Sequence, residues 1–273
     1  MGKNFKTYLK ILFLIIIFAL LFLIQFLNYL KIINVFVTGV LGTLWYWNYI
    51  TIGIIAIFYI FKIKKFNFWD FIIGFIISAG CCINGFNPVI TPIVFLSFLA
   101  GASIFREYNQ EFKFSVNLKN ILKSIVFGIL IGIIPGIINI IEYFLELYVP
   151  ITINFYDIWQ AFLRALNPAI SEEIVFRFFP LAFITNAFKG KIQNTKIANF
   201  LIYFLLIIPH NIMHDSFFPE YWMSNTLSTI LYLIYMCIVF GIPSVWLIKN
   251  KNIWSSVGFH WFCDFARFVF FKN

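Results

Sequence analysis

Long apolar runs, separated by short polar or basic segments, dominate the pattern of this sequence. A helix that crosses a bilayer needs about 20 consecutive apolar residues. A helix is expected to restart at Asn167-Pro168, because proline suits the first helical turn. This restart would separate an amphipathic piece over residues 156–166 from the span that follows. The fold class is therefore predicted to be all-α, a polytopic integral membrane bundle. The runs predict eight or nine transmembrane helices, over residues 11–30, 35–61, 68–83, 89–105, 121–148, 168–188, 197–214, 225–248 and 253–270.

Composition excludes a soluble globular protein. Hydrophobic residues make up 62% of the 273 residues and charged residues only 11%, whereas a soluble domain carries about 25% charged residues. The pattern contains no soluble domain and no internal repeat. We expect one continuous membrane domain, with N-terminal membrane helices over residues 1–150 and, over residues 151–273, a core that carries the polar motifs described below.

The net charge of +9 comes from basic residues that lie between the apolar runs and form no continuous patch. Membrane topology and attraction to anionic lipid account for them, so the lipid bilayer is an expected partner and nucleic acid is not. Loops over residues 149–157 and 215–221 hold acids and no Lys or Arg. The positive-inside rule predicts a multi-pass protein of the cell membrane with a cytoplasmic N-terminus and a first helix retained as a signal anchor. The basic clusters are Lys3/Lys6/Lys10, Lys62/Lys64/Lys65, Arg106/Lys113/Lys119, Lys189/Lys191/Lys196 and Lys249/Lys251.

Charged residues interrupt the sixth apolar run, in the stretch Ser171-Glu172-Glu173-Ile174-Val175-Phe176-Arg177. Ionisable groups at membrane depth are costly, which makes them candidates for function. Glu172 and Glu173 are adjacent and point about 100° apart on a helix, so we expect them to have different roles. Glu173 and Arg177 are four residues apart and can pair on one face. A structural ion pair, with Glu172 capping the helix or facing water, is the alternative reading of this stretch.

All three histidines of the chain lie in or at the end of apolar runs. His210 and His214 are four residues apart on the seventh run, and His260 precedes Asp264 by four residues on the ninth. A glutamate and a histidine in an apolar cavity can activate water as a general base pair. A second histidine with an aspartate can stabilise an oxyanion that forms at a carbonyl. This set of groups suits amide hydrolysis.

The same groups suit a metal ion, since two histidines at this spacing match zinc geometry. The possible ligands are Glu172, His210, His214 and His260. The zinc-protease pattern H-E-x-x-H is absent, because Asn211 occupies the position of its glutamate, and G-x-S-x-G and G-x-G-D are also absent.

Three motifs in order give a resemblance to a known family. They are Glu172-Glu173-x-x-x-Arg177, Leu206-x-x-x-His210 and His260-x-x-x-Asp264. This pattern resembles the CPBP family of intramembrane proteases, which includes the type II CAAX prenyl endopeptidases and the bacterial Abi-type proteins. The similarity covers about residues 160–270. Two positions depart from the family pattern, Leu206 where the family has Phe and Asp264 where the eukaryotic-type enzymes tend to have Asn.

The resemblance implies a membrane-embedded endopeptidase whose substrate is a peptide or a membrane protein. Glu172 and His210 would activate water, and His260 and Asp264 would stabilise the oxyanion. Glu173 and Arg177 would hold the site together, and His214 would support it. We favour a mechanism without a cofactor, with zinc as the alternative. Two other functions stay open, a non-catalytic immunity or scaffold protein on the same fold and a proton-coupled transporter.

Overall fold

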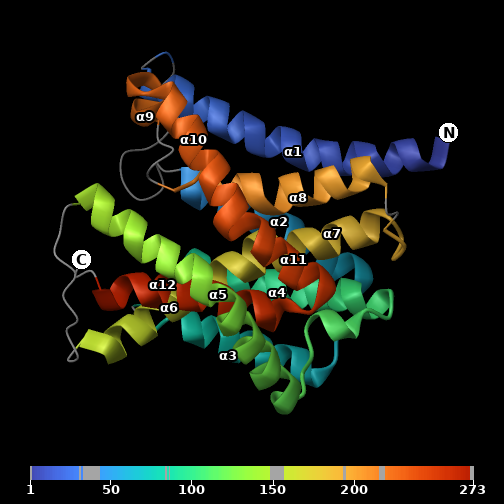
Figure 1. Ribbon diagram of the computed structural model, residues 1–273. Helices are drawn as coiled ribbons and strands as arrows, with labels where there is room; N and C mark the ends of the chain where they lie inside the picture. The colour runs from blue at the N-terminus through green and yellow to red at the C-terminus, as the bar shows by residue number, and fades with distance from the viewer. Residues whose placement is uncertain are drawn as a thin grey trace.

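The computed structural model describes residues 2–30, 32, 44–83, 85, 87–147, 157–192, 195–214 and 219–270. This part of the chain is helical and contains no strand, which confirms the predicted all-α bundle (Figure 1). The two π-helical turns η4 and η6 each continue directly into the helix that follows. The α-helices are α1 (Gly2–Tyr29), α2 (Leu44–Ile63), α3 (Phe68–Cys81), α4 (Ile90–Glu107), α5 (Leu118–Leu147), α6 (Ile158–Glu173), α7 (Phe179–Ala187), α8 (Lys196–Asn211), α9 (Pro219–Ser224), α10 (Thr226–Met236), α11 (Ile242–Asn250) and α12 (Ile253–Phe270), and the short turns are η2 (Glu111–Lys113), η4 (Ile174–Phe178) and η6 (Cys237–Gly241).

Five helical stretches of the described residues are long and apolar enough to cross a membrane: Thr7–Tyr29, Tyr46–Ile63, Ile90–Glu107, Leu118–Glu142 and Thr226–Asn250. The last of these joins α10, η6 and α11. Helices α3 and α8 are apolar but shorter. The start of the predicted second span, over residues 35–43, lies outside the described residues, as do most of the loops predicted over 149–157 and 215–221.

The predicted helix restart at Asn167-Pro168 is wrong. Helix α6 begins at Ile158 and passes through Pro168 without a break, so the amphipathic piece and the motif that follows belong to one helix. Proline removes a single backbone donor, and the neighbouring helical hydrogen bonds carry the helix past it. The predicted sixth span is therefore built from the end of α6, from η4 and from α7.

The segment of η4 and α7 lies at the centre of the core. Every residue from Ile174 to Ile184 is buried. The ring of Phe178 packs against Phe98 and Phe105 of α4, with ring centroids 5.6 and 5.3 Å apart. Gly101 of α4 makes room for this ring, because a Cβ at that position would lie 2.5 Å from Phe178. Apolar packing on all sides thus holds the motif-bearing segment in place.

Helices α5 and α12 approach each other closely along a line of glycines. A Cβ on Gly128 would lie 2.0 Å from the carbonyl oxygen of Ser255, and one on Gly258 would lie 2.3 Å from that of Ile125. One turn further along α5, a Cβ on Gly132 would lie 3.0 Å from a backbone oxygen of α12. Absent side chains therefore let the two backbones touch, and α5 fixes the position of α12 (Figure 1).

Two of the predicted basic segments meet at one end of the bundle. Nζ of Lys113 donates to the carbonyl oxygen of Lys249, and Nε1 of Trp254 donates to the carbonyl oxygen of Ser115 at 2.9 Å. The segments 106–119 and 249–252 therefore lie at the same end of the molecule, as the alternation of charge predicts. The cytoplasmic location of that end stays a prediction.

Candidate active site

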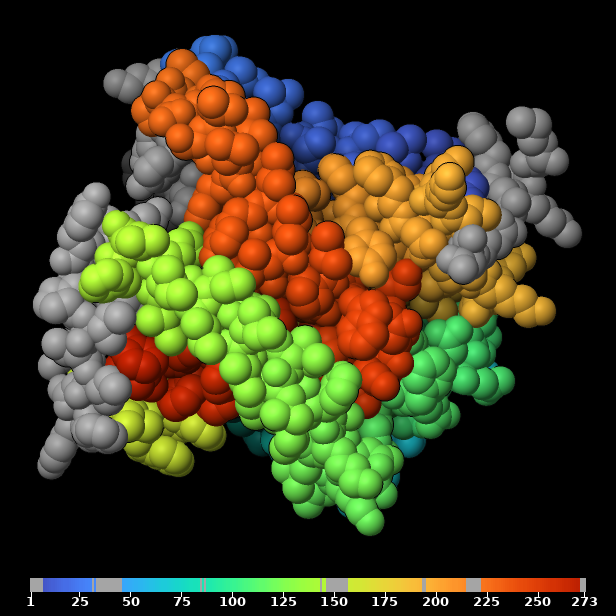
Figure 2. All heavy atoms as spheres, viewed as in Figure 1, coloured from blue at the N-terminus to red at the C-terminus, as the bar shows by residue number. Residues whose placement is uncertain are grey.

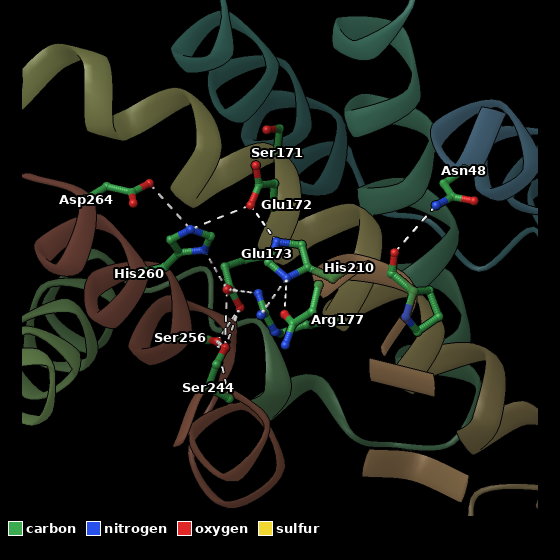
Figure 3. A network of polar contacts seen from close by, with 12 residues as sticks. Asn48, Ser171, Glu172, Glu173, Arg177, His210, Ser244, Ser256, His260 and Asp264 are labelled. Atoms are coloured by element: carbon green, nitrogen blue, oxygen red, sulfur yellow. Dashed lines mark hydrogen bonds and ion pairs between the residues drawn. The ribbon is translucent and has the colours of Figure 1, made fainter. Parts of the chain in front are cut away.

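Glu172 and Glu173 are the last two residues of α6 and stand directly before the π-helical turn. A π-helical turn places an extra residue in the helix, a feature often found at functional sites. Both carboxylates are buried. Figure 3 shows them pointing to different partners, Glu172 to His210 and Glu173 to Arg177. The two adjacent acids thus occupy different polar surroundings, as their spacing on a helix predicts.

Histidines from two other helices hold Glu172. Its Oε2 lies 2.5 Å from Nε2 of His210 on α8 and 3.6 Å from Nε2 of His260 on α12. His214 also lies close, since its ligand atom and those of Glu172 and His210 are all within 4.8 Å of one another. A carboxylate whose orientation is fixed in this way can accept a proton from a water held beside it.

Glu173 is surrounded by donors. Its carboxylate accepts hydrogen bonds from Arg177, from Ser256 and from Ser244, whose Oγ lies 3.0 Å from Oε2. It also lies 2.9 Å from Nδ1 of His260. A buried charge is tolerated where it is paired and hydrogen-bonded in this manner. Glu173 is therefore an anchor that joins η4, α11 and α12.

The contact with Arg177 assigns the tautomer of His210. Nδ1 of the ring lies 3.1 Å from NH2 of Arg177 and 3.1 Å from Oδ1 of Asn211. A guanidinium has donors only, whereas a flip of the asparagine amide exchanges its oxygen and nitrogen, so Arg177 decides the assignment. Nδ1 is therefore the acceptor, and Nε2 carries the hydrogen that it donates to Glu172. In this arrangement His210 orients the carboxylate, and Glu172 is the group with a lone pair for a proton.

His260 is fixed at one nitrogen and faces two carboxylates with the other. Nδ1 donates to Glu173, while Nε2 lies 3.6 Å from Glu172 and 3.5 Å from Oδ2 of Asp264. These two separations are longer than a normal N–H···O hydrogen bond of about 2.9 Å. Nε2 therefore points into the space between the two acids, where the protonated, imidazolium form of His260 can donate to an oxygen placed there.

Exposure identifies the open side of this cluster. The side chains of His260 and Asp264 are each 14% exposed, compared with 9% for Glu172, 5% for His210 and 0% for Glu173. The α12 side of the cluster, with His260 and Asp264, is therefore its less buried side. The structure brings together all seven residues singled out from the sequence, Glu172, Glu173, Arg177, His210, His214, His260 and Asp264.

His214 completes a group of three potential metal ligands with Glu172 and His210, whose ligand atoms all lie within 4.8 Å of one another. Tetrahedral zinc with bonds of 2.0–2.1 Å separates its ligand atoms by about 3.3 Å, and the contact of 2.5 Å between Glu172 and His210 is too short for that. A zinc-bound imidazole also donates its second N–H to an acceptor, and Nδ1 of His210 faces both the donors of Arg177 and Oδ1 of Asn211. A zinc ion held by these three side chains would require Glu172 and His210 to move apart.

Sequence reasoning missed three residues that position the site. Ser244 and Ser256 hydrogen-bond to Glu173 and also to each other, with 2.6 Å between their hydroxyl oxygens. Asn48 of α2 donates at 3.4 Å to the carbonyl oxygen of Pro209, directly before His210 (Figure 3). Each is an ordinary polar residue in an apolar run. The only signal in the sequence is that none of them has a polar partner nearby in the chain, which suggests a partner on another helix.

The fold and the site together define a helical membrane protein with a buried centre of carboxylates and histidines. One protein family, described as Type II CAAX prenyl endopeptidase Rce1-like, matches residues 154–266 of the chain. The match contains all three motifs and confirms the resemblance that they indicate, and it supports a CAAX protease-type hydrolase. Comparison with curated proteins and with solved structures gives no match.

Proposed function

We propose that the protein is a membrane-embedded endopeptidase that hydrolyses a peptide bond with water activated by Glu172. One observation carries this proposal. The buried carboxylate of Glu172 lies 2.5 Å from His210 and 3.6 Å from His260, and His260 is on the less buried side of the cluster. A purely structural ion pair needs Glu173 and Arg177 but gives no reason for this second carboxylate and its two histidines.

The proposed reaction begins with a water beside Glu172. The carboxylate takes a proton as the water oxygen bonds to the carbonyl carbon, which leaves a tetrahedral oxyanion. The protonated Glu172 then gives this proton to the amide nitrogen, and the C–N bond breaks. The products are a carboxylic acid and an amine. His210 keeps the carboxylate in one orientation through both proton transfers.

The oxyanion needs a donor in a water-poor site, where such donors act strongly. Nε2 of His260 is the proposed donor, because Glu173 holds its other nitrogen at 2.9 Å. Asp264, 3.5 Å from Nε2, orients the same ring. Neither step uses a metal ion, and the short contact between Glu172 and His210 supports this choice.

The proposed substrate is a membrane-associated protein or peptide, since the site lies within a bundle of apolar helices. Two probes test the proposal: a fluorogenic peptide that ends in a prenylated CAAX sequence, and the same peptide without the prenyl group. Glu172→Gln and His210→Ala should each form product at least about 100-fold more slowly, the usual effect of losing a general base. Glu107→Gln is the matched control, because this carboxylate pairs with Lys65 outside the site.

The outcome of this experiment separates the candidate functions. Suppose that the unchanged protein cleaves at least one probe and that both variants cleave it equally fast. The assignment of Glu172 as the group that activates water is then wrong, and a non-catalytic role for the cluster is favoured. Metal analysis of the purified protein tests the choice of mechanism. Stoichiometric zinc that is lost in His210→Ala would overturn the metal-free scheme.

A further inference from the structure

A cavity of about 620 Å³ lies at the end of the bundle where segments 106–119 and 249–252 meet. Its walls come from the first turns of α5, from the segment before α5 and from the start of α12. None of the seven residues of the carboxylate–histidine site lines it. Figure 2 shows the N-terminal end of α5, in green, at the foot of the molecule. The cavity is therefore separate from the proposed hydrolytic centre.

Two lysines give this cavity a positive charge. Lys123 and Lys251 both line it, and neither forms an ion pair within the part of the chain that the structure describes. Nζ of Lys251 lies 5.1 Å from the ring centroid of Phe127, which places the charge beside an apolar wall. The acid in the lining, Glu111, is bound by Arg106 at 2.6 Å. The cavity therefore offers two cations to an anionic ligand.

Neutral donors stand next to these lysines. Oδ1 of Asn117 accepts from the backbone N–H of Asn120 at 3.3 Å, which leaves its NH2 group as the outward end. Nδ2 of Asn252 donates to the hydroxyl of Ser124 at 2.8 Å, so the hydrogen of that hydroxyl is available to an acceptor. Cations combined with amide and hydroxyl donors suit the oxygens of a phosphate group.

An apolar surface adjoins the polar one. Phe112 and Val116 both line the cavity, and they are 58% and 43% exposed. Exposed apolar side chains beside a basic cavity can receive the hydrocarbon of a ligand. A ligand that joins a phosphate to hydrocarbon matches both surfaces, whereas free phosphate uses only one.

We propose that this cavity binds the headgroup of an anionic phospholipid, with its phosphate between Lys123 and Lys251 and the start of its acyl chains against Phe112 and Val116. Basic cavities between helices at the cytoplasmic surface are a known mode of headgroup recognition. This proposal is independent of the hydrolytic one, because it uses neither the residues nor the activity of the first site.

Binding is measured on the full-length protein in a neutral detergent, with phosphatidylglycerol as the probe and thermal stabilisation and direct titration as the readouts. Phosphatidylglycerol should raise Tm, and phosphatidylcholine, which has no net charge, should raise it less. Each lysine contributes about 1 kcal/mol to such binding, so Lys123→Gln and Lys251→Gln should each weaken it roughly fivefold and the double variant roughly 25-fold. High salt should weaken binding by the unchanged protein.

A double variant with the same loss of charge, Lys119→Gln/Lys191→Gln, is the control, because both side chains are exposed and neither lines the cavity. It should bind phosphatidylglycerol like the unchanged protein. Equal binding by the cavity variant and the control would overturn the proposal. Inorganic phosphate distinguishes the source of the anion: if it reproduces the full stabilisation and displaces the lipid, the cavity is a site for free phosphate and the lipid assignment is wrong.

Discussion

Oε1 of Glu173 and Nδ1 of His260 lie 2.9 Å apart, so the second acid of the adjacent pair fixes the ring whose other nitrogen faces the first acid. Sequence spacing suggests only that Glu173 pairs with Arg177. The structure gives Glu173 further partners on α11 and α12, and one of them, His260, belongs to the proposed oxyanion site. Changes at Glu173 are therefore expected to act through His260.

Glu173→Gln should lower kcat on the order of 100-fold with little change in KM, because misplacement of a reacting group by about 1 Å has such an effect. The amide retains one acceptor and adds a donor where Glu173 meets only donors, so the ring of His260 loses its fixed position. Steady-state kinetics with the two peptide probes measures the effect. Glu111→Gln, which also breaks a contact between an arginine and a carboxylate but outside the site, should leave kcat unchanged. Equal kcat for both variants would contradict the anchoring role.

Ser256→Ala should destabilise the fold by about 1.5–3 kcal/mol, the usual value for a buried hydrogen bond to a charged group. Chemical denaturation in detergent measures this loss. Ser97→Ala is the matched control, since Ser97 is buried and its hydroxyl has no hydrogen-bond partner among the described residues. Similar stability losses in the two variants would show that Glu173 does not depend on Ser256.

Arg177→Lys should impair hydrolysis although it conserves the charge. Arg177 uses NH1 for Glu173 and NH2 for Nδ1 of His210, and a single ammonium lacks this planar fork. His210 then loses the donor that fixes its tautomer and orients Glu172 less well. We expect kcat to fall at least tenfold while circular dichroism shows unchanged helix content. Retention of full kcat would contradict the assignment of His210 as a donor to Glu172.

Gly128→Ala should lower stability by about 1–3 kcal/mol or more, because the new methyl group meets backbone and overpacked sites rarely relax fully. Its Cβ would lie 2.0 Å from the carbonyl oxygen of Ser255, so α12 has to move. Gly53→Ala is the comparison, since its Cβ would meet only the side chain of Ile93, which can rotate away. Thermal unfolding of the two variants should show a clearly larger loss for Gly128→Ala. The reverse order would show that α5 and α12 do not pack as described.

Stability should depend on pH through Lys113, which lies between two spans. Burial and, to a smaller extent, the nearby charge of Lys249 together lower the pKa of its ammonium group to about 8. The unfolded chain keeps a pKa of about 10.4, so between pH 8 and 10 the unfolded state binds more protons and the folded state gains stability as pH rises. Tm in that window should rise less in Lys113→Met than in the unchanged protein. Identical slopes would contradict the buried state of this lysine.

Much of this arrangement is readable from the sequence because apolar runs and isolated charges are local signals. The ninth predicted span, 253–270, coincides with α12, and the three motifs indicate the residues that meet at the site. The number of helices long enough to span is less readable, since α3 and α8 are short and the π-helical turns η4 and η6 interrupt two of the predicted spans. Helix starts at proline are uncertain for the reason seen at Pro168, where one missing hydrogen bond does not end a helix.

The tertiary partners could not be predicted in the same way. Ser244 and Ser256 lie 12 residues apart on different helices, and nothing in their local sequence distinguishes them from lipid-facing or capping serines. Their common partner Glu173 depends on how α11 and α12 rotate about their axes. For α12 the close contact with glycines on α5 limits this rotation, and α5 carries none of the three motifs.

The glycine contact between α5 and α12 also limits what can be separated from this chain. The family match covers residues 154–266 and so includes α12 but not α5. A fragment restricted to the matching region would leave the backbone of α12 at Ser255 and Gly258 facing lipid where it now meets Gly128 and Ile125. The region that matches the family is thus not expected to fold by itself. Helix α12, which carries His260, packs against α5, which lies outside the matching region.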